Sequence, residues 1–237
     1  MTKFEGFLTI VASLLVGAGG YQAYAKHDIQ RNFDIQREFH RWLYSRSEWA
    51  GNTRWLGVRA LKNPMDMWVY QDILYETKPD VLVEAGTAFG GSAYYFASIF
   101  DLLGKGRVIT IDIAATPSRP THPRITYLLG SSTAEETLRQ VRDGIHPGER
   151  VMVVLDSDHH AEHVRRELED YSPLVCQGCY LVVEDTNING NPVLPDYGPG
   201  PNEAVHDFLK SHKDFAQDFS REYLGVTYFP GGWLKKK

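Results

Sequence analysis

Short apolar runs alternate with helix-like runs between residues 80 and 212, and this alternation constrains the fold more than any other feature. Continuously apolar strands separated by helices are typical of a parallel sheet that is covered on both faces. We therefore predict an α/β, Rossmann-like, mostly parallel and doubly wound sheet. The predicted strands are 80–86, 106–113, 124–130, 150–156, 180–185 and 223–229, and the predicted helices are 90–104, 133–145, 161–175 and 203–212.

A glycine-rich loop, VLVEAGTAFGGS, joins the first of these strands to the first helix. An open parallel sheet binds its ligand at such a loop. The loop has neither a GxGxxG nor a Walker pattern, which argues against a phosphate-rich ligand. Asp112 ends the next strand, where a carboxylate can accept hydrogen bonds from a ribose diol, so we predict S-adenosylmethionine. The predicted contacts are Glu84, Gly86, Thr87, Gly90, Gly91, Ser92, Asp112, Ser131 and Asp156.

Four carboxylates follow two later strands of the predicted sheet. Asp156 and Asp158 come after the apolar run VMVVL, and Glu184 and Asp185 end the run YLVVED. Because the carboxyl ends of parallel strands meet at one edge, we expect these groups to lie near the glycine-rich loop. Oxygen ligands suit a hard divalent cation such as Mg²⁺. The alternative is that each acid caps the helix that follows it.

Three histidines, His159, His160 and His163, lie next to these acids. Imidazoles at i and i+4 on a helix can bind zinc, which gives a rival metal site. His159 is better placed as a general base, because an imidazole beside a metal-bound hydroxyl can accept its proton near neutral pH. The residues alone leave open whether Asp156 or Asp158 binds the ion.

Several stretches resemble the cephalosporin hydroxylase/rhamnosyl O-methyltransferase family, from about Phe39 to the C-terminus. They are RWLGVRALKNPMDMWVYQDIL, VEAGTAFGGSAYYFAS, VITIDI, LDSDHH, VVEDTNING, GPGPNEAV and PGGWLKK. The resemblance implies a class I methyltransferase fold and metal-dependent methyl transfer from S-adenosylmethionine to a hydroxyl, which we expect on a sugar of a glycolipid, a polysaccharide or a glycosylated natural product. It also implies His159 as the base. The implied metal ligands are Asp156, Glu184 and Asp185, with Asp158 as the alternative.

Two other functions remain alternatives at this point. One is a hydroxylase component that acts on a β-lactam-type molecule. An iron and oxoglutarate site needs His-x-Asp and a later His, and the sole such triplet, His212 to Asp214, is followed by no histidine. The other is a non-catalytic module that binds S-adenosylmethionine, which the filled acidic cluster argues against.

The first 25 residues are apolar and approach the length of a membrane span. We predict that residues 7–25 anchor the chain to a membrane, with a cleaved signal peptide or a buried or interfacial helix as alternatives. Positive charge is concentrated after this segment, which would keep the catalytic domain in the cytoplasm. We divide the chain into this segment (1–25), an amphipathic helix from 28 to about 46 with a lead-in (26–63), and the methyltransferase domain (64–237).

Charge and cysteine content limit the partners and the compartment. The formal net charge is −5 and the basic residues are scattered, so we expect no nucleic-acid partner. Cys176 and Cys179 are the sole cysteines, and we interpret them as two small buried residues in a turn, which fits a reducing compartment. A homo-oligomer is compatible with the sequence.

Overall fold

The structure is a computed structural model that describes residues 26, 30–46 and 48–237. The chain forms two compact units, residues 1–43 and residues 44–237. Residues 30–45 are helical, as predicted. The second unit begins at Tyr44, so the lead-in that precedes residue 64 packs with the α/β unit.

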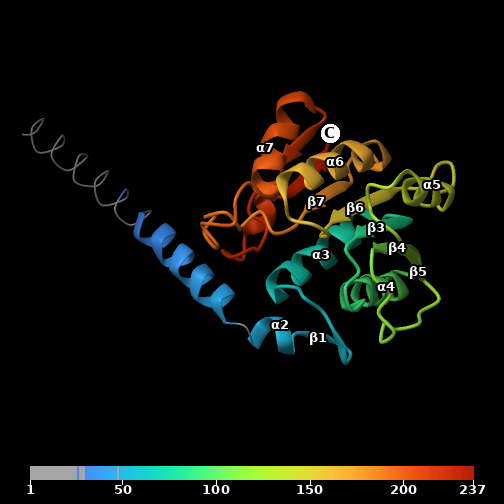
Figure 1. Cartoon of the computed structure of the whole chain (residues 1–237), viewed down its shortest axis with the longest axis horizontal. Helices are drawn as coiled ribbons and strands as arrows, with labels where there is room; N and C mark the ends of the chain where they lie inside the picture. The colour runs from blue at the N-terminus through green and yellow to red at the C-terminus, as the bar shows by residue number, and fades with distance from the viewer. Residues whose placement is uncertain (1–25, 27–29, 47) are drawn as a thin grey trace, which may run out of the picture. The chain divides into compact units, whose positions relative to one another are not determined.

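A seven-stranded sheet runs through residues 44–237 in the order β5-β4-β3-β6-β7-β9-β8 (Figure 1). The five strands from β5 to β7 are parallel, and β9 and β8 are antiparallel. A separate hairpin joins β1 (Arg54–Trp55) to β2 (Val58–Arg59). The sheet strands are β3 (Val81–Ala85), β4 (Arg107–Asp112), β5 (Ile125–Leu129), β6 (Val151–Leu155), β7 (Tyr180–Val183), β8 (Phe215–Gln217) and β9 (Trp233–Lys236).

Helices cover both faces of this sheet, as predicted (Figure 1). The central strands β3, β6 and β7 are buried at every position, which is why their sequences are continuously apolar. Alternate residues of β3, such as Val81 and Val83, belong to one core cluster with residues of α6 and α7. The helices are α2 (Glu48–Asn52), α3 (Pro64–Thr77), α4 (Gly91–Leu103), α5 (Glu135–Asp143), α6 (Ala161–Tyr171) and α7 (Pro201–Ser211), with 3-10 turns η1 (Ser172–Leu174) and η2 (Phe219–Glu222).

The predicted last strand, 223–229, was wrong. These residues form turns after η2, and β9 begins later, at Trp233. Tyr228 uses its backbone N–H to bind the Asp66 carboxylate at 2.9 Å, so this N–H is not available to a strand ladder. The apolar side chains of this segment are buried for a different reason, since Phe229 packs against Trp233 with ring centroids 4.5 Å apart.

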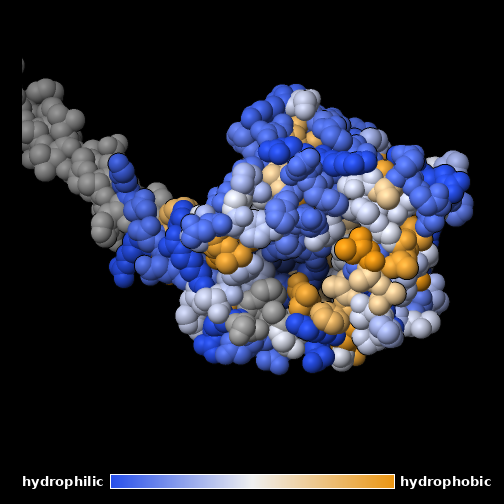
Figure 2. Space-filling view, in the orientation of Figure 1, coloured by the Kyte–Doolittle hydropathy of each residue, from blue (hydrophilic) through white to orange (hydrophobic). Residues whose placement is uncertain are grey.

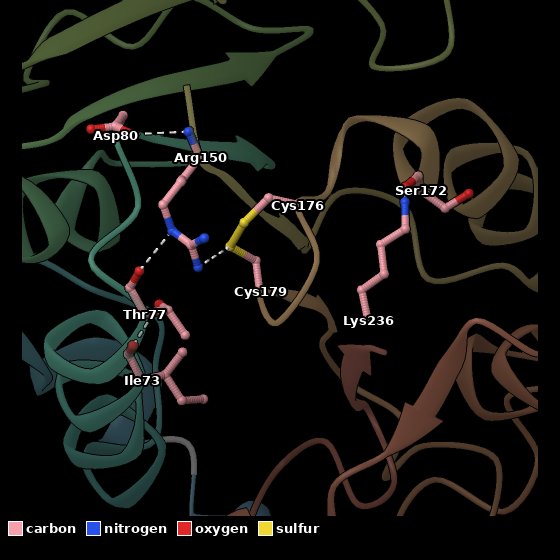
Figure 3. The surroundings of a disulfide bond; sticks show 8 residues. All are labelled: Ile73, Thr77, Asp80, Arg150, Ser172, Cys176, Cys179 and Lys236. Carbon is pink, nitrogen blue, oxygen red and sulfur yellow. Dashed lines mark hydrogen bonds between the residues drawn. A yellow bond between two sulfur atoms is a disulfide. The ribbon is translucent and has the colours of Figure 1, made fainter. Parts of the chain in front are cut away.

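The two cysteines also differ from our interpretation, because the structure joins Cys176 and Cys179 in a disulfide (Figure 3). The turn before β7 brings their Cα atoms to 5.2 Å, within the range that a disulfide spans. Arg150 lies beside the bond and donates to the Cys179 sulfur at 3.4 Å and to the Thr77 carbonyl at 3.1 Å. The bond closes a turn at the amino end of β7, one strand length from the acids at its carboxyl end.

The strand order places a topological switch point at β3. Its successor in the chain, β4, pairs on one side of it, whereas β6 pairs on the other. Open α/β sheets bind ligands in the crevice at the carboxyl ends of strands at such a point. The predicted site residues after β3, β4, β6 and β7 therefore share one edge of the sheet. In the described part of the chain, no helix has the length and apolar character of a membrane span. The predicted anchor, 1–25, lies outside the described residues.

Candidate active site

Three polar side chains converge where β6 and β7 end. Asp156 follows β6, Asp185 follows β7, and His159 lies in the turn before α6. One ligand atom of each lies within 4.8 Å of the others, an arrangement that can hold a metal ion. His159 Nε2 lies 3.1 Å from Asp185 Oδ2, so the carboxylate fixes the orientation of the imidazole.

A buried lysine completes this group from the interior side. Lys62, which precedes α3, forms ion pairs with both Asp156 and Glu184, and its side chain is 4% exposed. Its Nζ is 2.8 Å from Glu184 Oε2, while the hydroxyl of Tyr70 donates to Glu184 Oε1 at 2.7 Å. Both oxygens of Glu184 thus have a partner from the segment 62–70, and Lys62 links Glu184 to Asp156.

The second half of LDSDHH has a different arrangement. Asp158 accepts a hydrogen bond from the backbone N–H of His160 at 2.8 Å and contacts its ring. His163 lies on α6, with its Nε2 3.1 Å from Ser132 Oγ and 3.4 Å from Glu167. The three histidines therefore have three different sets of partners, and the candidate metal-binding group of the described residues contains His159 without His160 or His163. Of the two aspartates, the structure groups Asp156 with His159 and Asp185.

The glycine-rich loop packs tightly against neighbouring backbone. Gly86 has φ +100°, and a Cβ there would lie 1.8 Å from the Asp156 carbonyl oxygen. A Cβ on Gly91 would lie 2.1 Å from the Arg59 carbonyl oxygen. Glycine is thus needed at both positions because another chain segment packs directly against the loop backbone. This close packing brings Asp156 and Arg59 to the loop.

Two adjoining cavities open at this edge and share Gly86, Ala88, Asp156 and Ser157 in their walls. The first has a volume of about 330 Å³ and includes the metal-binding group. The second has a volume of about 590 Å³ and is lined by residues at the carboxyl ends of β4, β5 and β6, among them Asp112, Ser131 and Asp158. Figure 2 shows a hollow near the middle of the visible face of this unit, with hydrophilic side chains above it.

Some of the residues that we predicted to contact the cofactor line the cavities, and others are buried beneath the cavity walls or lie outside them. Thr87, Gly91 and Ser92 line the first cavity. Glu84 is fully buried at the end of β3, where the Thr110 hydroxyl donates to its carboxylate at 2.6 Å. It lies beneath the loop and lines neither of the two cavities, and the predicted contact of Glu84 with the cofactor stays a prediction. Gly90 caps α4 and is absent from both cavity walls.

Comparison with known proteins identifies the family. A model of the family described as Rhamnosyl O-methyltransferase/CmcI matches residues 47–237. The chain belongs to this family. The rhamnosyl O-methyltransferase of Mycobacterium leprae (strain TN) is 38% identical over 210 residues, which cover 86% of this chain and 91% of that protein. That of Mycobacterium tuberculosis (strain ATCC 25618 / H37Rv) is 39% identical over 208 residues, which cover 84% of each chain.

A solved structure of CmcI with Mg and SAM has the same fold. It superposes with a TM-score of 0.59 over 78% of this chain and 76% of that chain, at 24% sequence identity. Family and fold together make the chain an S-adenosylmethionine-dependent O-methyltransferase. The iron-site alternative has no geometric support, because His212 ends α7 with its ring stacked on Phe208, away from the carboxyl edge of the sheet.

Sequence reasoning missed the site residues of this O-methyltransferase that come from chain segments outside the predicted sheet. Lys62 and Tyr70 lie in the motif RWLGVRALKNPMDMWVYQDIL, which we used only for the resemblance. Tyr44 and Tyr228 both line the first cavity, with ring centroids 5.3 Å apart, although they lie near opposite ends of the sequence 44–237. A lysine beside Asn-Pro is not a pattern that predicts a buried side chain. The available clue was its position between apolar residues and the start of a helix.

Burial makes ionisation of this acidic cluster costly. It raises the pKa of Glu184 to about 7, and the neighbouring Asp156 adds to the effect. Burial also raises the pKa of Asp156 and of Asp185. Lys62 attracts all three carboxylates, but one ammonium group does not offset the desolvation and mutual repulsion of three acids.

We expect the metal-free protein to lose stability as the pH rises from 5 to 8. A carboxyl group whose folded pKa lies above its unfolded value binds its proton more tightly in the folded state, so its contribution is full below the unfolded pKa and is lost as the pH rises through the folded pKa. Asp66, whose pKa burial raises to about 7, adds to this slope. A tenfold difference in proton affinity between the folded and unfolded states changes the free energy of unfolding by about 1.4 kcal/mol.

Thermal unfolding measured against pH, with EDTA or with Mg²⁺, tests this expectation. Mg²⁺ should flatten the profile, because a cation favours the ionised carboxylates. Asp66→Asn should remove part of the slope in EDTA while leaving the effect of Mg²⁺ intact. A profile in EDTA that is level between pH 5 and 8 would contradict the buried-carboxyl account.

Proposed function

We propose that this O-methyltransferase transfers a methyl group from S-adenosylmethionine to a hydroxyl of a sugar, with the help of Mg²⁺ or another hard divalent cation. The observation that carries the proposal is the group of Asp156, His159 and Asp185 at the junction of the two cavities. The names of the relatives, rhamnosyl O-methyltransferase, support a rhamnosyl or similar sugar as the acceptor.

The second cavity fits the nucleoside part of S-adenosylmethionine. Asp112 lies on its wall and holds the loop residue Ala88 through a hydrogen bond of 2.8 Å from the backbone N–H. Arg119 pairs with the same carboxylate at 2.9 Å. The backbone N–H of Ala114 donates to the other oxygen of Asp112 at 2.9 Å. Because a carboxylate has about four acceptor positions, one remains for a ribose hydroxyl. Ser131 on the same cavity's wall offers a further hydroxyl.

The donor set at the junction fits a hard cation. Asp156 and Asp185 supply oxygen ligands, and no thiolate belongs to the described group. By the resemblance, Glu184 would be a third ligand, held in position by Lys62 and Tyr70. Asp158 faces the second cavity and is half-exposed, which supports Asp156 over Asp158 as the ligand after β6.

The mechanism assigns each residue one task. When bound, S-adenosylmethionine supplies a methyl group on sulfonium and the cation lowers the pKa of the acceptor hydroxyl. His159 accepts the hydroxyl proton at Nδ1, because its Nε2–H donates to Asp185. Asp185 orients the imidazole and stabilises it once it is protonated. Gly86 and Asp156 lie on the walls of both cavities, so they place the two reactants next to each other.

The proposal includes a location for the enzyme at a membrane. Residues 7–25 would hold the cytoplasmic catalytic domain at a membrane, where a lipid-linked sugar is accessible. This placement rests on the sequence alone. Assembly into a homo-oligomer likewise stays a prediction.

Incubation with labelled S-adenosylmethionine and Mg²⁺ tests the function. The acceptors are glycolipid and polysaccharide extracts of the host and p-nitrophenyl α-L-rhamnopyranoside. We expect label in a sugar-containing fraction and none in a reaction without acceptor. Label that enters only protein, nucleic acid or non-glycosylated molecules would contradict a sugar acceptor.

A further inference from the structure

The first cavity has an aromatic wall in addition to its acids. Tyr44 and Tyr228 line it as an edge-to-face pair, with ring centroids 5.3 Å apart and an interplanar angle of 70°. Phe229 also lines the cavity and is buried. The same cavity contains Asp156 and Asp185 together with His159. One cavity thus combines hydroxyl-binding groups with an apolar wall.

The wall is held in place by backbone contacts of Tyr228. Its N–H donates to Asp66 at 2.9 Å, and its carbonyl accepts from the N–H of Asn187, two residues after Asp185, at 3.2 Å. Asp66 in turn accepts a hydrogen bond from Asn63 at 3.1 Å at the start of α3. Tyr228 is 5% exposed, so little of it can move without unpacking the site. The aromatic wall is therefore preorganised relative to the acids.

A pyranose matches this combination of groups. Its hydroxyls lie around the rim of the ring, while its C–H groups form apolar faces that pack on aromatic rings. Pockets for small ligands characteristically pair such apolar walls with a few placed polar groups. A cavity of about 330 Å³ has room for one sugar ring but not for an oligosaccharide.

We propose that Tyr44 and Tyr228 form the acceptor subsite, which binds a single pyranose ring by one apolar face and directs two neighbouring hydroxyls toward Asp156, Asp185 and His159. This inference rests on the proposed function and adds the residues that select a sugar. Tyr44 and Tyr228 act by ring contact, so their hydroxyl groups are not required.

Matched substitutions separate ring contact from hydrogen bonding. Tyr44→Leu keeps an apolar side chain but removes the ring, and Tyr44→Phe keeps the ring but removes the hydroxyl. For p-nitrophenyl α-L-rhamnopyranoside, we expect Tyr44→Leu to raise KM about tenfold and Tyr44→Phe to leave KM within about twofold, with KM for S-adenosylmethionine unchanged in both. Tyr228→Leu should resemble Tyr44→Leu, and the control Tyr75→Leu, on an exposed part of α3, should match the parent enzyme.

Saturation-transfer NMR with the same glycoside, Mg²⁺ and S-adenosylhomocysteine provides a readout that does not depend on turnover. We expect strong transfer to protons of one face of the sugar ring, and its loss in Tyr44→Leu. Equal KM and equal transfer in Tyr44→Leu and the parent enzyme would overturn the subsite, even if methylation proceeds. Transfer to the sugar without methylation would support the subsite and contradict the proposed function. Preference for a catechol over the glycoside would overturn the sugar assignment.

Discussion

His159→Gln should lower kcat by about 10²- to 10⁴-fold while it leaves binding of Mg²⁺ and S-adenosylmethionine within about threefold of the parent enzyme. The range is that expected for loss of a general base. Glutamine keeps a polar side chain of similar length that can contact Asp185, but it accepts no proton near neutral pH. The measurement is single-turnover methyl transfer together with calorimetric titration of the metal and of the cofactor.

The neighbouring histidine provides the control for this prediction. His160→Gln alters a ring that pairs with Asp158 and is 70% exposed, so kcat should stay within about twofold. If His159→Gln lost Mg²⁺ binding and activity together, the imidazole would be a metal ligand, and the base assignment would be wrong. If it kept most of its rate, the proton would leave by another route.

Lys62→Met should lower the free energy of unfolding of the metal-free enzyme by about 3–5 kcal/mol. Removal of one partner from a buried ion pair leaves the other charge uncompensated, which costs about this much. Lys62 has two such partners, Asp156 and Glu184, and its side chain is 4% exposed. Because a bound cation supplies positive charge to the same acids, saturating Mg²⁺ should restore more stability to this variant than to the parent enzyme.

Urea unfolding with EDTA and with Mg²⁺ measures both effects. The control is Lys105→Met, which removes a surface ion pair with Asp80 and should cost no more than about 1 kcal/mol. A Lys62→Met enzyme as stable as the parent in EDTA would show that the lysine does not hold the acids together. Equal stabilisation of both by Mg²⁺ would show that Lys62 and the cation act on different groups.

The sheet was predictable because its sequence signal is local. Strands such as β3 and β6 are apolar at every position since both faces are covered, and the acids that follow them necessarily reach the same edge. The segment 223–229 has the same apolar character but a different cause. Phe229 at its end is buried against Tyr70 and Trp233, and no local pattern distinguishes such turns from a strand.

In the candidate site, the residues at strand ends were predictable from the sequence, whereas those that come from the preceding chain were not. Asp156, His159 and Asp185 are close to strand ends, so the fold alone brings them together. Lys62 and Tyr44 reach the site from the chain that precedes the sheet, through contacts that span about a hundred residues or more. Their identity becomes visible only when the path of that chain is known, because a single lysine or tyrosine in a sequence is usually a surface residue.

The rate of methyl transfer to the sugar acceptor, measured after chelation and again after addition of Mg²⁺, tests the central claim most directly. Parent enzyme, Asp156→Asn and Asp158→Asn should be compared. We expect the parent and Asp158→Asn to lose activity in EDTA and to regain it with Mg²⁺, whereas Asp156→Asn stays inactive at every Mg²⁺ concentration that saturates the parent. A rate that is indifferent to the chelator, or an active Asp156→Asn enzyme, would contradict metal-dependent transfer at the ends of β6 and β7.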